Sequence, residues 1–508
     1  MSKVQHRQDR ESLGVMPVLL IPLDARSVEP LHHQVYRGLR EAILSGRLHA
    51  GVRIPSTRWL AEQLGVSRST ILVAFDQLVA EGYIVGVVGS GSYVARQLPD
   101  HLLQVTRPPG QSSQATEGAG RATPIAQRVT ALRQIPRITR RFSTEPHPFQ
   151  LGVPPVDQFP MAVWSRLGTN RYRDLDASRL YHGTPAGSPA LREAIAAHHA
   201  GARGVRCTPD QVIVLSSAQE AMDLACRVVL NPGDPVWFEE PGYAAARGAL
   251  VAAGARIVPV PVDAEGLVVE RGVDLEPRAS LVYVTPSHQC PTGATLSLER
   301  RLALLHWAAR ADAWILEDDY DSEYRYTGRP LAALQGLDVA SRVLYIGTFN
   351  KTLFPSLRLA YLVVPTSLLE AVRAVRSLGG QHAPIIDQAI LTDFLTEGHY
   401  ARYLRRMRIV CRDRRDALIA AAQRDASGLL EMTRPETGLY AIAWLAAGLD
   451  DRRARAAAAQ RGIEVAPLSN YYAGPCPRGG LVLGYGGVPP DLIATGMRQL
   501  AAALRSIG

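Results

Sequence analysis

The hydrophobic pattern divides the chain into stretches of three kinds. Over residues 24–96, apolar positions recur at helical spacing and end in a short pattern typical of a β-hairpin. Residues 99–141 are rich in Pro, Gly, Ser, Gln and Arg, a composition that cannot bury a core. From residue 149 onward, short β-branched runs alternate with helical stretches. We therefore expect a tail over 1–23, a helical domain over 24–97, a linker over 98–148 and a large α/β domain over 149–508.

The apolar runs of the large domain have the length of buried strands. They lie at residues 212–215, 235–238, 256–260, 281–284 and 314–316. Helical stretches such as 299–311 fill the gaps between them. This alternation predicts a mostly parallel sheet with helices on both faces, so the expected fold class is a multidomain chain with an α/β body.

Two short helices are predicted within the N-terminal domain. The first begins after Ser56, which can cap it, and ends at Gly65. The second opens at residues 67–70 and ends near Gly82. Its apolar positions share one helical face, namely Ile71, Ala74, Phe75, Leu78 and Val79. Two helices joined by a tight turn predict a helix-turn-helix, in which the first turn of the second helix meets base edges and phosphates. Residues 83–94 predict a hairpin wing.

This stretch resembles the winged helix-turn-helix of the GntR superfamily through IPSTRWLAEQLGVSRSTI, AFDQLVAEGYI and GSGSYV. The resemblance implies a double-stranded DNA operator as partner, contacted by Arg58, Ser67, Arg68, Ser69, Thr70 and the wing glycine Gly89. Three positions depart from the pattern. Val87 and Val88 stand where a basic residue or His often precedes the wing glycine, and Leu72 stands where some members have another arginine. A small helical packing domain is the alternative, but it would not require Ser-Arg-Ser-Thr at a helix start.

Charge and cysteine content narrow the class of protein. The chain carries a net charge of +9, and residues 1–141 hold 18 basic against 10 acidic residues, which leaves the remainder near neutral. An anionic partner is therefore expected for the N-terminal domain alone. No apolar run reaches membrane-spanning length, and the five cysteines include no C-x-x-C pair. We expect a cytoplasmic, reduced protein with no metal site and no membrane contact.

Lysine is almost absent from the chain. Only Lys3 and Lys351 are lysines among its 56 basic residues. Arginine does not readily lose its proton to act as a nucleophilic amine, so an isolated interior lysine points to Schiff-base chemistry with a carbonyl compound such as pyridoxal phosphate. The alternative for Lys351 is an ordinary surface lysine. Asp318 and Tyr320 favour the chemistry, because their extended spacing places a carboxylate and a phenol on the same side, where they suit a protonated pyridine nitrogen and a ring 3-oxygen. A surface acidic turn is their alternative.

Further segments offer ligands to a phosphate and a ring. Residues 216–220 follow a strand and open a helix, so their backbone N–H groups suit a phosphate. Arg358, seven residues beyond Lys351, is a candidate phosphate partner. Tyr243 follows Pro-Gly at the end of another strand, where an aromatic side chain can stack on a ring. Each of these segments also occurs in α/β proteins without a cofactor.

Together these segments resemble the fold-type I pyridoxal-phosphate enzymes of the aspartate aminotransferase family, over roughly residues 150–508. The shared motifs are RLYHGTPAGSPALREAIA, EEPGY, TPSHQCPTG, LEDDYDSEYRY and GTFNKTLFPSLRLAY. The resemblance implies that Lys351 binds the cofactor covalently, Asp318 pairs with the pyridine nitrogen and Tyr320 contacts the 3-oxygen. It also implies that Tyr243 stacks on the ring. The phosphate ligands that it implies are Ser217, Ala218, Gln219, Thr348 and Arg358, together with Tyr181 of the partner subunit.

The two halves together resemble the MocR/GabR-type transcription regulators, in which a GntR-like domain is fused to an aminotransferase-like domain. That resemblance implies a homodimer formed through the aminotransferase-like domain. Two positions depart from a working transaminase. Cys290 replaces the asparagine before Pro-Thr-Gly, and Val482 stands where an arginine usually binds the substrate carboxylate. A valine cannot make that contact, and Arg478 is only near it in sequence.

Three hypotheses stay open. The chain is a transcription regulator that senses a small amine, an amino acid or the cofactor itself; an active aminotransferase with an appended DNA-binding domain; or a repressor whose large domain is an inert dimerisation scaffold. The helix-turn-helix argues against a plain enzyme, and Lys351 with Asp318 and Tyr320 argues against an inert scaffold. Val482 favours sensing over turnover.

Overall fold

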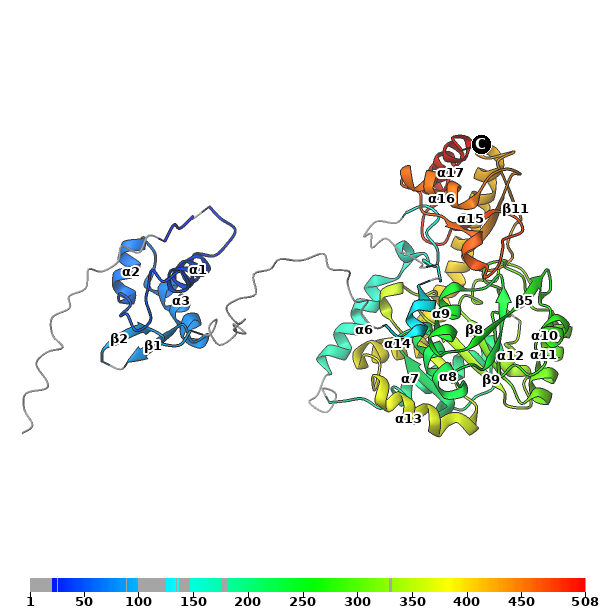
Figure 1. Ribbon diagram of the computed structural model, residues 1–508, viewed down its shortest axis with the longest axis horizontal. Coiled ribbons are helices and arrows are strands. Elements are labelled where there is room, and N and C mark those ends of the chain that lie inside the picture. Colours follow the sequence, from blue (N-terminus) through cyan, green and yellow to red (C-terminus); the bar gives the residue numbers. More distant parts are fainter. Residues whose placement is uncertain are drawn as a thin grey trace, which may run out of the picture. The chain divides into compact units, whose positions relative to one another are not determined.

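The computed structural model describes residues 21–24, 26–87, 89–98, 125–133, 135–136, 147–174, 181–328 and 331–507. The chain divides into two compact units, Met1–Thr123 and Pro124–Gly508, and each is described by itself (Figure 1). Most of the predicted tail, most of the predicted linker and Val88 lie outside the described residues.

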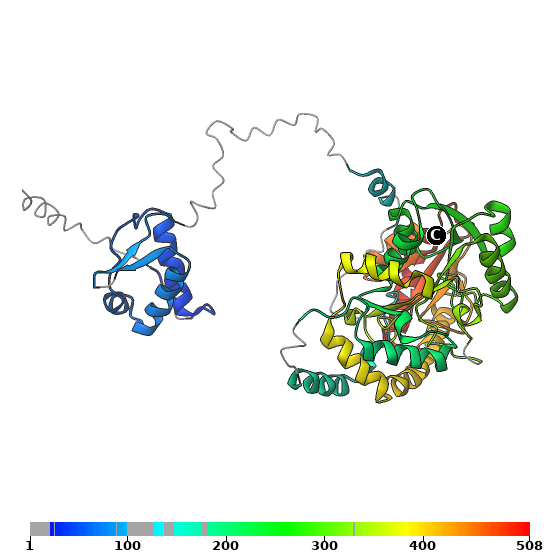
Figure 2. The ribbon, with the colours of Figure 1, turned by 90° about the horizontal axis from the view of Figure 1, so that it is seen from below.

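In the described residues of the first unit, helices and a hairpin are present, and Figure 2 shows them from a second side. Its elements are α1 (Leu31–Leu44), α2 (Thr57–Leu64), α3 (Arg68–Ala80), β1 (Ile84–Val87) and β2 (Gly91–Val94). The strands pair antiparallel, with Ile84 opposite Val94 and Val87 opposite Gly91. Helices and hairpin share one core, which confirms the predicted winged helix-turn-helix.

The helix ends follow the predicted caps. The Ser56 hydroxyl accepts a hydrogen bond from the Trp59 N–H at 3.2 Å, and Gly65 ends α2 in the left-handed region at φ 65°. One sequence prediction is wrong: the pattern places Val79 on the buried face of α3, but Val79 is 48% exposed. At 3.6 residues per turn, position i+8 has rotated about 80° away from position i, and the core ends before it reaches Val79.

The second unit is built on an eight-stranded sheet of order β3-β10-β9-β8-β7-β4-β5-β6. The five strands from β9 to β5 are parallel to one another, and β10 and β6 run antiparallel to the strands that they pair with. The strands are β3 (Val212–Leu215), β4 (Pro235–Glu240), β5 (Arg256–Asp263), β6 (Gly266–Leu267), β7 (Leu281–Val284), β8 (Trp314–Asp319), β9 (Val343–Thr348) and β10 (Ala360–Val363). Each predicted strand is present within three residues of its expected ends.

Helices cover both faces of this sheet, as predicted. Alternate residues of β3 point into two different cores: Val212 and Val214 into one, Ile213 and Leu215 into the other. The first core is closed by α7 (Pro189–Arg203), α14 (Ile385–Thr396) and α15 (His399–Asp425). The second is closed by α8 (Ala218–Val229), α9 (Ala244–Ala252) and α13 (Leu369–Gly379). The remaining helices around the sheet are α5 (Gln127–Leu132), α6 (Met161–Arg173), α10 (Val269–Leu275), α11 (Leu298–Ala311) and α12 (Leu334–Leu337).

A smaller antiparallel sheet near the C-terminus was not predicted. Its order is β11-β12-β14-β13, and its strands are β11 (Leu430–Met432), β12 (Tyr440–Leu445), β13 (Ala466–Pro467) and β14 (Gly480–Gly484). It packs with α15, α16 (Asp451–Gln460) and α17 (Pro490–Arg505) around a core of its own. Within the described residues, no helix combines the length and apolar character needed to cross a membrane.

Candidate functional site

The large unit contains a pocket of about 290 Å³ at the carboxyl ends of its parallel strands. This is the edge at which open α/β sheets bind ligands, because strand ends and helix starts converge there. The pocket brings together predicted residues from five separate segments. They are Ser217, Ala218, Gln219, Tyr243, Asp318, Tyr320, Thr348, Lys351 and Arg358. Val482 and Cys290 also line it.

Two residues singled out in the sequence lie outside the pocket wall. The Tyr181 side chain is 75% exposed, and its predicted role concerned a partner subunit, so that role stays a prediction. Arg478 forms an ion pair with Glu431 at 3.0 Å and lies over the Trp444 ring. Arg478 therefore does not take the place of the arginine that Val482 replaces.

Asp318 supplies one of the buried carboxyls that line the pocket. It is buried near the end of β8, and its Oδ2 accepts a hydrogen bond of 2.7 Å from the hydroxyl of Tyr283 on β7. Among the described residues its Oδ1 is also buried, but has no hydrogen-bond partner. Burial raises the pKa of Asp318 to about 7, and the Tyr283 hydrogen bond and the positive charge of Lys351 oppose that rise. A cationic donor at Oδ1 would remove the penalty.

Lys351 is half-buried and follows β9 by three residues. Its ammonium Nζ donates a hydrogen bond of 3.1 Å to the carbonyl oxygen of Gly152. Because Lys351 and Asp318 line one pocket and their charges interact, a small ring bound there can meet both groups. This is the arrangement that the sequence predicted for a covalently held pyridine cofactor.

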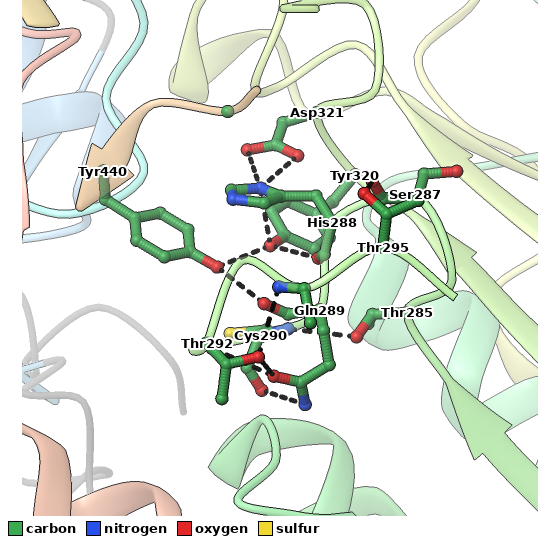
Figure 3. A network of polar contacts seen from close by, with 12 residues as sticks. Thr285, Ser287, His288, Gln289, Cys290, Thr292, Thr295, Tyr320, Asp321 and Tyr440 are labelled. Carbon is green, nitrogen blue, oxygen red and sulfur yellow. Dashed lines mark hydrogen bonds and ion pairs between the residues drawn. The ribbon is translucent and has the colours of Figure 1, made fainter. Parts of the chain in front are cut away.

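Tyr320 belongs to a buried polar network (Figure 3). Its hydroxyl donates to the His288 carbonyl at 2.8 Å and lies 2.8 Å from the Tyr440 hydroxyl. Asp321 holds Nδ1 of His288 at 2.9 Å and 3.0 Å, and the Tyr440 ring stacks on the imidazole at 4.8 Å. Burial raises the pKa of both tyrosines well above the ordinary value, so both phenols stay protonated and serve as hydrogen-bond donors.

A corner of the pocket with the chemistry to hold an anion lies at the start of α8. The Ser217 hydroxyl accepts a hydrogen bond of 3.1 Å from the Glu220 N–H and so caps the helix, while Ala218 and Gln219 form its first turn. Arg358 reaches the same pocket from the loop after β9, with a left-handed backbone at φ 55° that is uncommon for a residue with a side chain. Among the described residues, no carboxylate forms an ion pair with Arg358. A helix N-terminus beside such a guanidinium suits a phosphate group.

The residues present therefore fit pyridoxal phosphate. The pocket holds a primary amine at Lys351, a buried acceptor without a partner at Asp318 and a cationic corner at Arg358. These are the three chemical groups that the aldehyde, the pyridine nitrogen and the phosphate of the cofactor require. The roles of the individual residues stay predictions.

Sequence reasoning assigned no role to several residues of the pocket and its network. Tyr283, His288 and Tyr440 form hydrogen bonds with predicted site residues, and Asp321 contacts His288. His288 and Asp321 stand inside the quoted motifs TPSHQCPTG and LEDDYDSEYRY, so those motifs carried a usable signal. Tyr440 lies in an apolar strand with no such motif around it.

The predicted DNA-contacting residues lie at helix starts and in the wing of the first unit. Arg58 and Arg68 are exposed in the first turns of α2 and α3, and Ser69 is exposed beside Arg68. The Ser67 hydroxyl caps α3 by accepting the Thr70 N–H at 3.1 Å, and it also lies 2.7 Å from the Ser69 hydroxyl. In the wing turn, Gly89 adopts φ 77°, a conformation that favours glycine.

Two family models match this chain. The model of bacterial regulatory proteins of the gntR family covers residues 31–94, and the model of aminotransferase class I and II covers residues 165–479. The chain therefore combines a DNA-binding helix-turn-helix with an aminotransferase class I and II domain.

Relatives with both domains match almost the whole chain. The probable rhizopine catabolism regulatory protein MocR of Rhizobium meliloti is 39% identical over 96% of each chain. The pyridoxine biosynthesis transcriptional regulator PdxR of Corynebacterium glutamicum is 31% identical over 97% of this chain and 99% of that one. This chain belongs to the MocR-type family of helix-turn-helix transcription regulators.

The large unit also matches solved aminotransferase structures. LysN, the α-aminoadipate aminotransferase of Thermus thermophilus, aligns with a TM-score of 0.66 and 27% identity. The alignment covers 75% of this chain and 95% of LysN, whose structure contains N-(5'-phosphopyridoxyl)-L-leucine. The fold predicted from the sequence is confirmed.

Proposed function

We propose that this chain is a transcription regulator that binds pyridoxal phosphate covalently at Lys351 and couples the state of this pocket to DNA binding. The observation that carries the proposal is Oδ1 of Asp318, which is buried without a partner among the described residues in the pocket that Lys351 lines. A buried acceptor without a donor costs about 1–3 kcal/mol. A protonated pyridine nitrogen would supply a charge-assisted donor at that point.

When bound, pyridoxal phosphate supplies an electrophilic carbon that exchanges one amine for another. Lys351 would provide the amine of the chain, Asp318 would hold the pyridine proton and Tyr320 would contact the 3-oxygen. Tyr243 stacks on the ring. The phosphate is held by Ser217, Ala218, Gln219, Thr348 and Arg358, and by Tyr181 of the partner subunit in a homodimer formed through the large unit.

The effector is a small amine, an amino acid or the cofactor itself. Val482 is buried in the pocket wall, where an arginine would otherwise bind a substrate carboxylate, so an incoming amino acid lacks the usual clamp. Two relatives are named for rhizopine catabolism and for pyridoxine biosynthesis, and both names support a small-molecule effector. An effector shifts DNA binding only as far as its affinity differs between the two DNA-binding states.

The test uses the full-length protein with pyridoxal phosphate and borohydride. We expect one reduced cofactor per chain, located by peptide mass on Lys351. Lys351→Arg keeps the positive charge but cannot attach the cofactor, so it serves as the matched control and should show no added mass. A wild-type protein that gains no mass at Lys351 overturns the proposal.

The second candidate is an active aminotransferase with an appended DNA-binding domain. The observation in its favour is the pairing of Lys351 and Asp318 in one pocket. The cofactor-loaded protein would be given a panel of amines and amino acids with a keto-acid acceptor, and product and DNA affinity would be measured together. Many turnovers per chain favour the enzyme, whereas a change in DNA affinity with little product favours the regulator.

A further inference from the structure

The outward face of α3 is apolar at its centre. Residues 69, 72, 73 and 76 share this face, because they are spaced i, i+3, i+4 and i+7 along the helix. The opposite face is buried in the core of the unit, through Ile71, Ala74, Phe75 and Leu78. Leu72 is 41% exposed and Val73 is 49% exposed. Two large aliphatic side chains thus stand side by side on the solvent face of the second helix of the helix-turn-helix.

The charged groups around these two side chains point to one occupant, duplex DNA. Arg68 opens the same helix and is exposed, and Arg58 is exposed in the first turn of α2. Arginines at two helix starts suit a polyanion, because the positive ends of both helix dipoles add to their charge. In helix-turn-helix proteins the second helix enters the major groove. A groove that receives α3 would therefore also receive Leu72 and Val73, which follow Arg68 along the same helix.

We propose that Leu72 and Val73 recognise thymine by packing against C5-methyl groups in the major groove. The thymine methyl is the apolar group that a base pair presents there, and aliphatic side chains have no hydrogen-bonding group to offer any other base edge. Opposite cytosine the same side chains would cover the N4 amino group and leave it without an acceptor. The inference rests on the DNA binding of this family and adds the base that these two residues select.

Asp76 lies where the apolar part of this helix face ends. It lies on the same face as Val73, nearly one turn further along α3, and is exposed. A carboxylate is repelled by phosphates but accepts a hydrogen bond from the N4 amino group of cytosine. Asp76 therefore favours base edges over the backbone at this end of the helix, which keeps Leu72 and Val73 over the groove.

The test removes single methyl groups from the DNA. Duplexes that the full-length protein enriches from a randomised library supply the probe, and each thymine is replaced in turn by deoxyuridine, which lacks only the C5-methyl. We expect one or two positions in each half-site at which deoxyuridine weakens binding by roughly two- to fivefold per methyl group. In Leu72→Ala or Val73→Ala, the affinities for thymine and deoxyuridine at one of those positions should become equal.

Val79→Ala is the matched control, since Val79 is an exposed valine of the same helix that lies two turns beyond Leu72, near the C-terminal end of α3. It should keep the wild-type preference for thymine. Binding that is indifferent to deoxyuridine at every position overturns the inference, and so does a preference that survives in the Leu72→Ala/Val73→Ala double variant. If no duplex is enriched, DNA binding itself fails, which is a different result from enrichment without methyl dependence.

Discussion

Two helices in separate units begin in the same way and face very different surroundings. In α3 the Ser67 hydroxyl accepts the Thr70 N–H at 3.1 Å, and in α8 the Ser217 hydroxyl accepts the Glu220 N–H at 3.1 Å. In the first turn of α3, Arg68 and Ser69 are exposed to solvent. The first turn of α8 instead forms part of a pocket wall, and its Glu220 is ion-paired with the buried Arg376.

The capping hydrogen bonds of the two helices are alike, so the helix starts differ in their exposure to solvent. An exposed helix start can bind a long polyanion along its outer surface, and salt screens that attraction over about 10 Å. An enclosed helix start can hold a single phosphate in a site of lower dielectric constant, where each charge acts more strongly. The same local sequence signal can thus suit two kinds of anion, and burial decides which one fits.

The largest expected effect is that of salt, which should weaken DNA binding far more than binding of pyridoxal phosphate. Raising salt from about 50 to about 200 mM should weaken duplex binding roughly 1,000-fold if several phosphates are neutralised. The affinity for pyridoxal phosphate should change by less than about tenfold, because one enclosed anion releases few counterions. Fluorescence anisotropy on labelled DNA and cofactor titration measure both. Similar salt slopes for the two ligands would contradict the comparison.

Replacing Arg358 tests the enclosed site alone. Arg358→Gln should weaken pyridoxal phosphate about 10- to 100-fold, the equivalent of one charged hydrogen bond of about 1.5–3 kcal/mol. Pyridoxal lacks the phosphate, so its weaker binding should be the same in the wild type and the variant. Equilibrium dialysis of both compounds measures the difference. An equal loss for both compounds would show that Arg358 does not act through the phosphate.

Asp318→Asn should have opposite effects on cofactor binding and on the stability of the cofactor-free protein. Burial raises the pKa of Asp318 from 3.8 to about 7, so its protonated form favours folding below pH about 4. That contribution is lost as pH rises through about 7, because the ionised carboxylate is then buried. At about pH 8 the free energy of unfolding of the variant should exceed that of the wild type by about 1–3 kcal/mol.

The stability gain of Asp318→Asn should vanish near pH 4, where the wild-type carboxyl is already neutral. Thermal denaturation of both cofactor-free proteins across this pH range measures it. Pyridoxal phosphate should bind the variant at least about tenfold more weakly at about pH 8, because the amide cannot pair with a pyridinium charge. If the variant is less stable than the wild type at this higher pH, burial of the ionised Asp318 carboxylate is not what destabilises the cofactor-free protein.

The smallest expected effects on stability come from removing the two capping hydroxyls. Ser67→Ala and Ser217→Ala should each cost about 0.5–2 kcal/mol of helix stability, and replacement by Thr should restore most of it. The losses should be similar in the two units, since the hydrogen bonds are alike. Ser217→Ala should in addition lower the affinity for pyridoxal phosphate relative to pyridoxal. Chemical denaturation of each variant, with tryptophan fluorescence as the signal, measures the cost.

Local signals predicted much of this molecule. The cap at Ser56, the left-handed end at Gly65 and the buried strands follow from spacing and residue type within a few positions. Lys351 was found because lysine is almost absent from the chain, and Asp318 because its extended spacing to Tyr320 suits a cofactor ring. Such inferences need only composition or neighbouring residues.

The contacts that depend on distant segments could not be predicted in the same way. Tyr283 has the pattern of a core aromatic, and only the pairing of β7 with β8 places its hydroxyl at Asp318. Tyr440 reaches Tyr320 across 120 residues from an antiparallel sheet whose strands are too short to carry a clear period. Val79 shows that an apolar residue at helical spacing need not be buried, because the sequence does not show where the core ends.

Lys351 has a consequence for how the chain responds to aldehydes in general. Lys3 lies outside the described residues, so Lys351 is the single side-chain amine on the part of the chain that the structure describes. Pyridoxal phosphate reacts with accessible lysines on many proteins. On a lysine-rich surface, those lysines would compete with a pocket lysine for the free aldehyde. Here the rest of the described surface carries its positive charge as arginine, which forms no such adduct. The described surface therefore contributes no background titration, and an aldehyde adduct on this part of the chain would report on the Lys351 pocket alone.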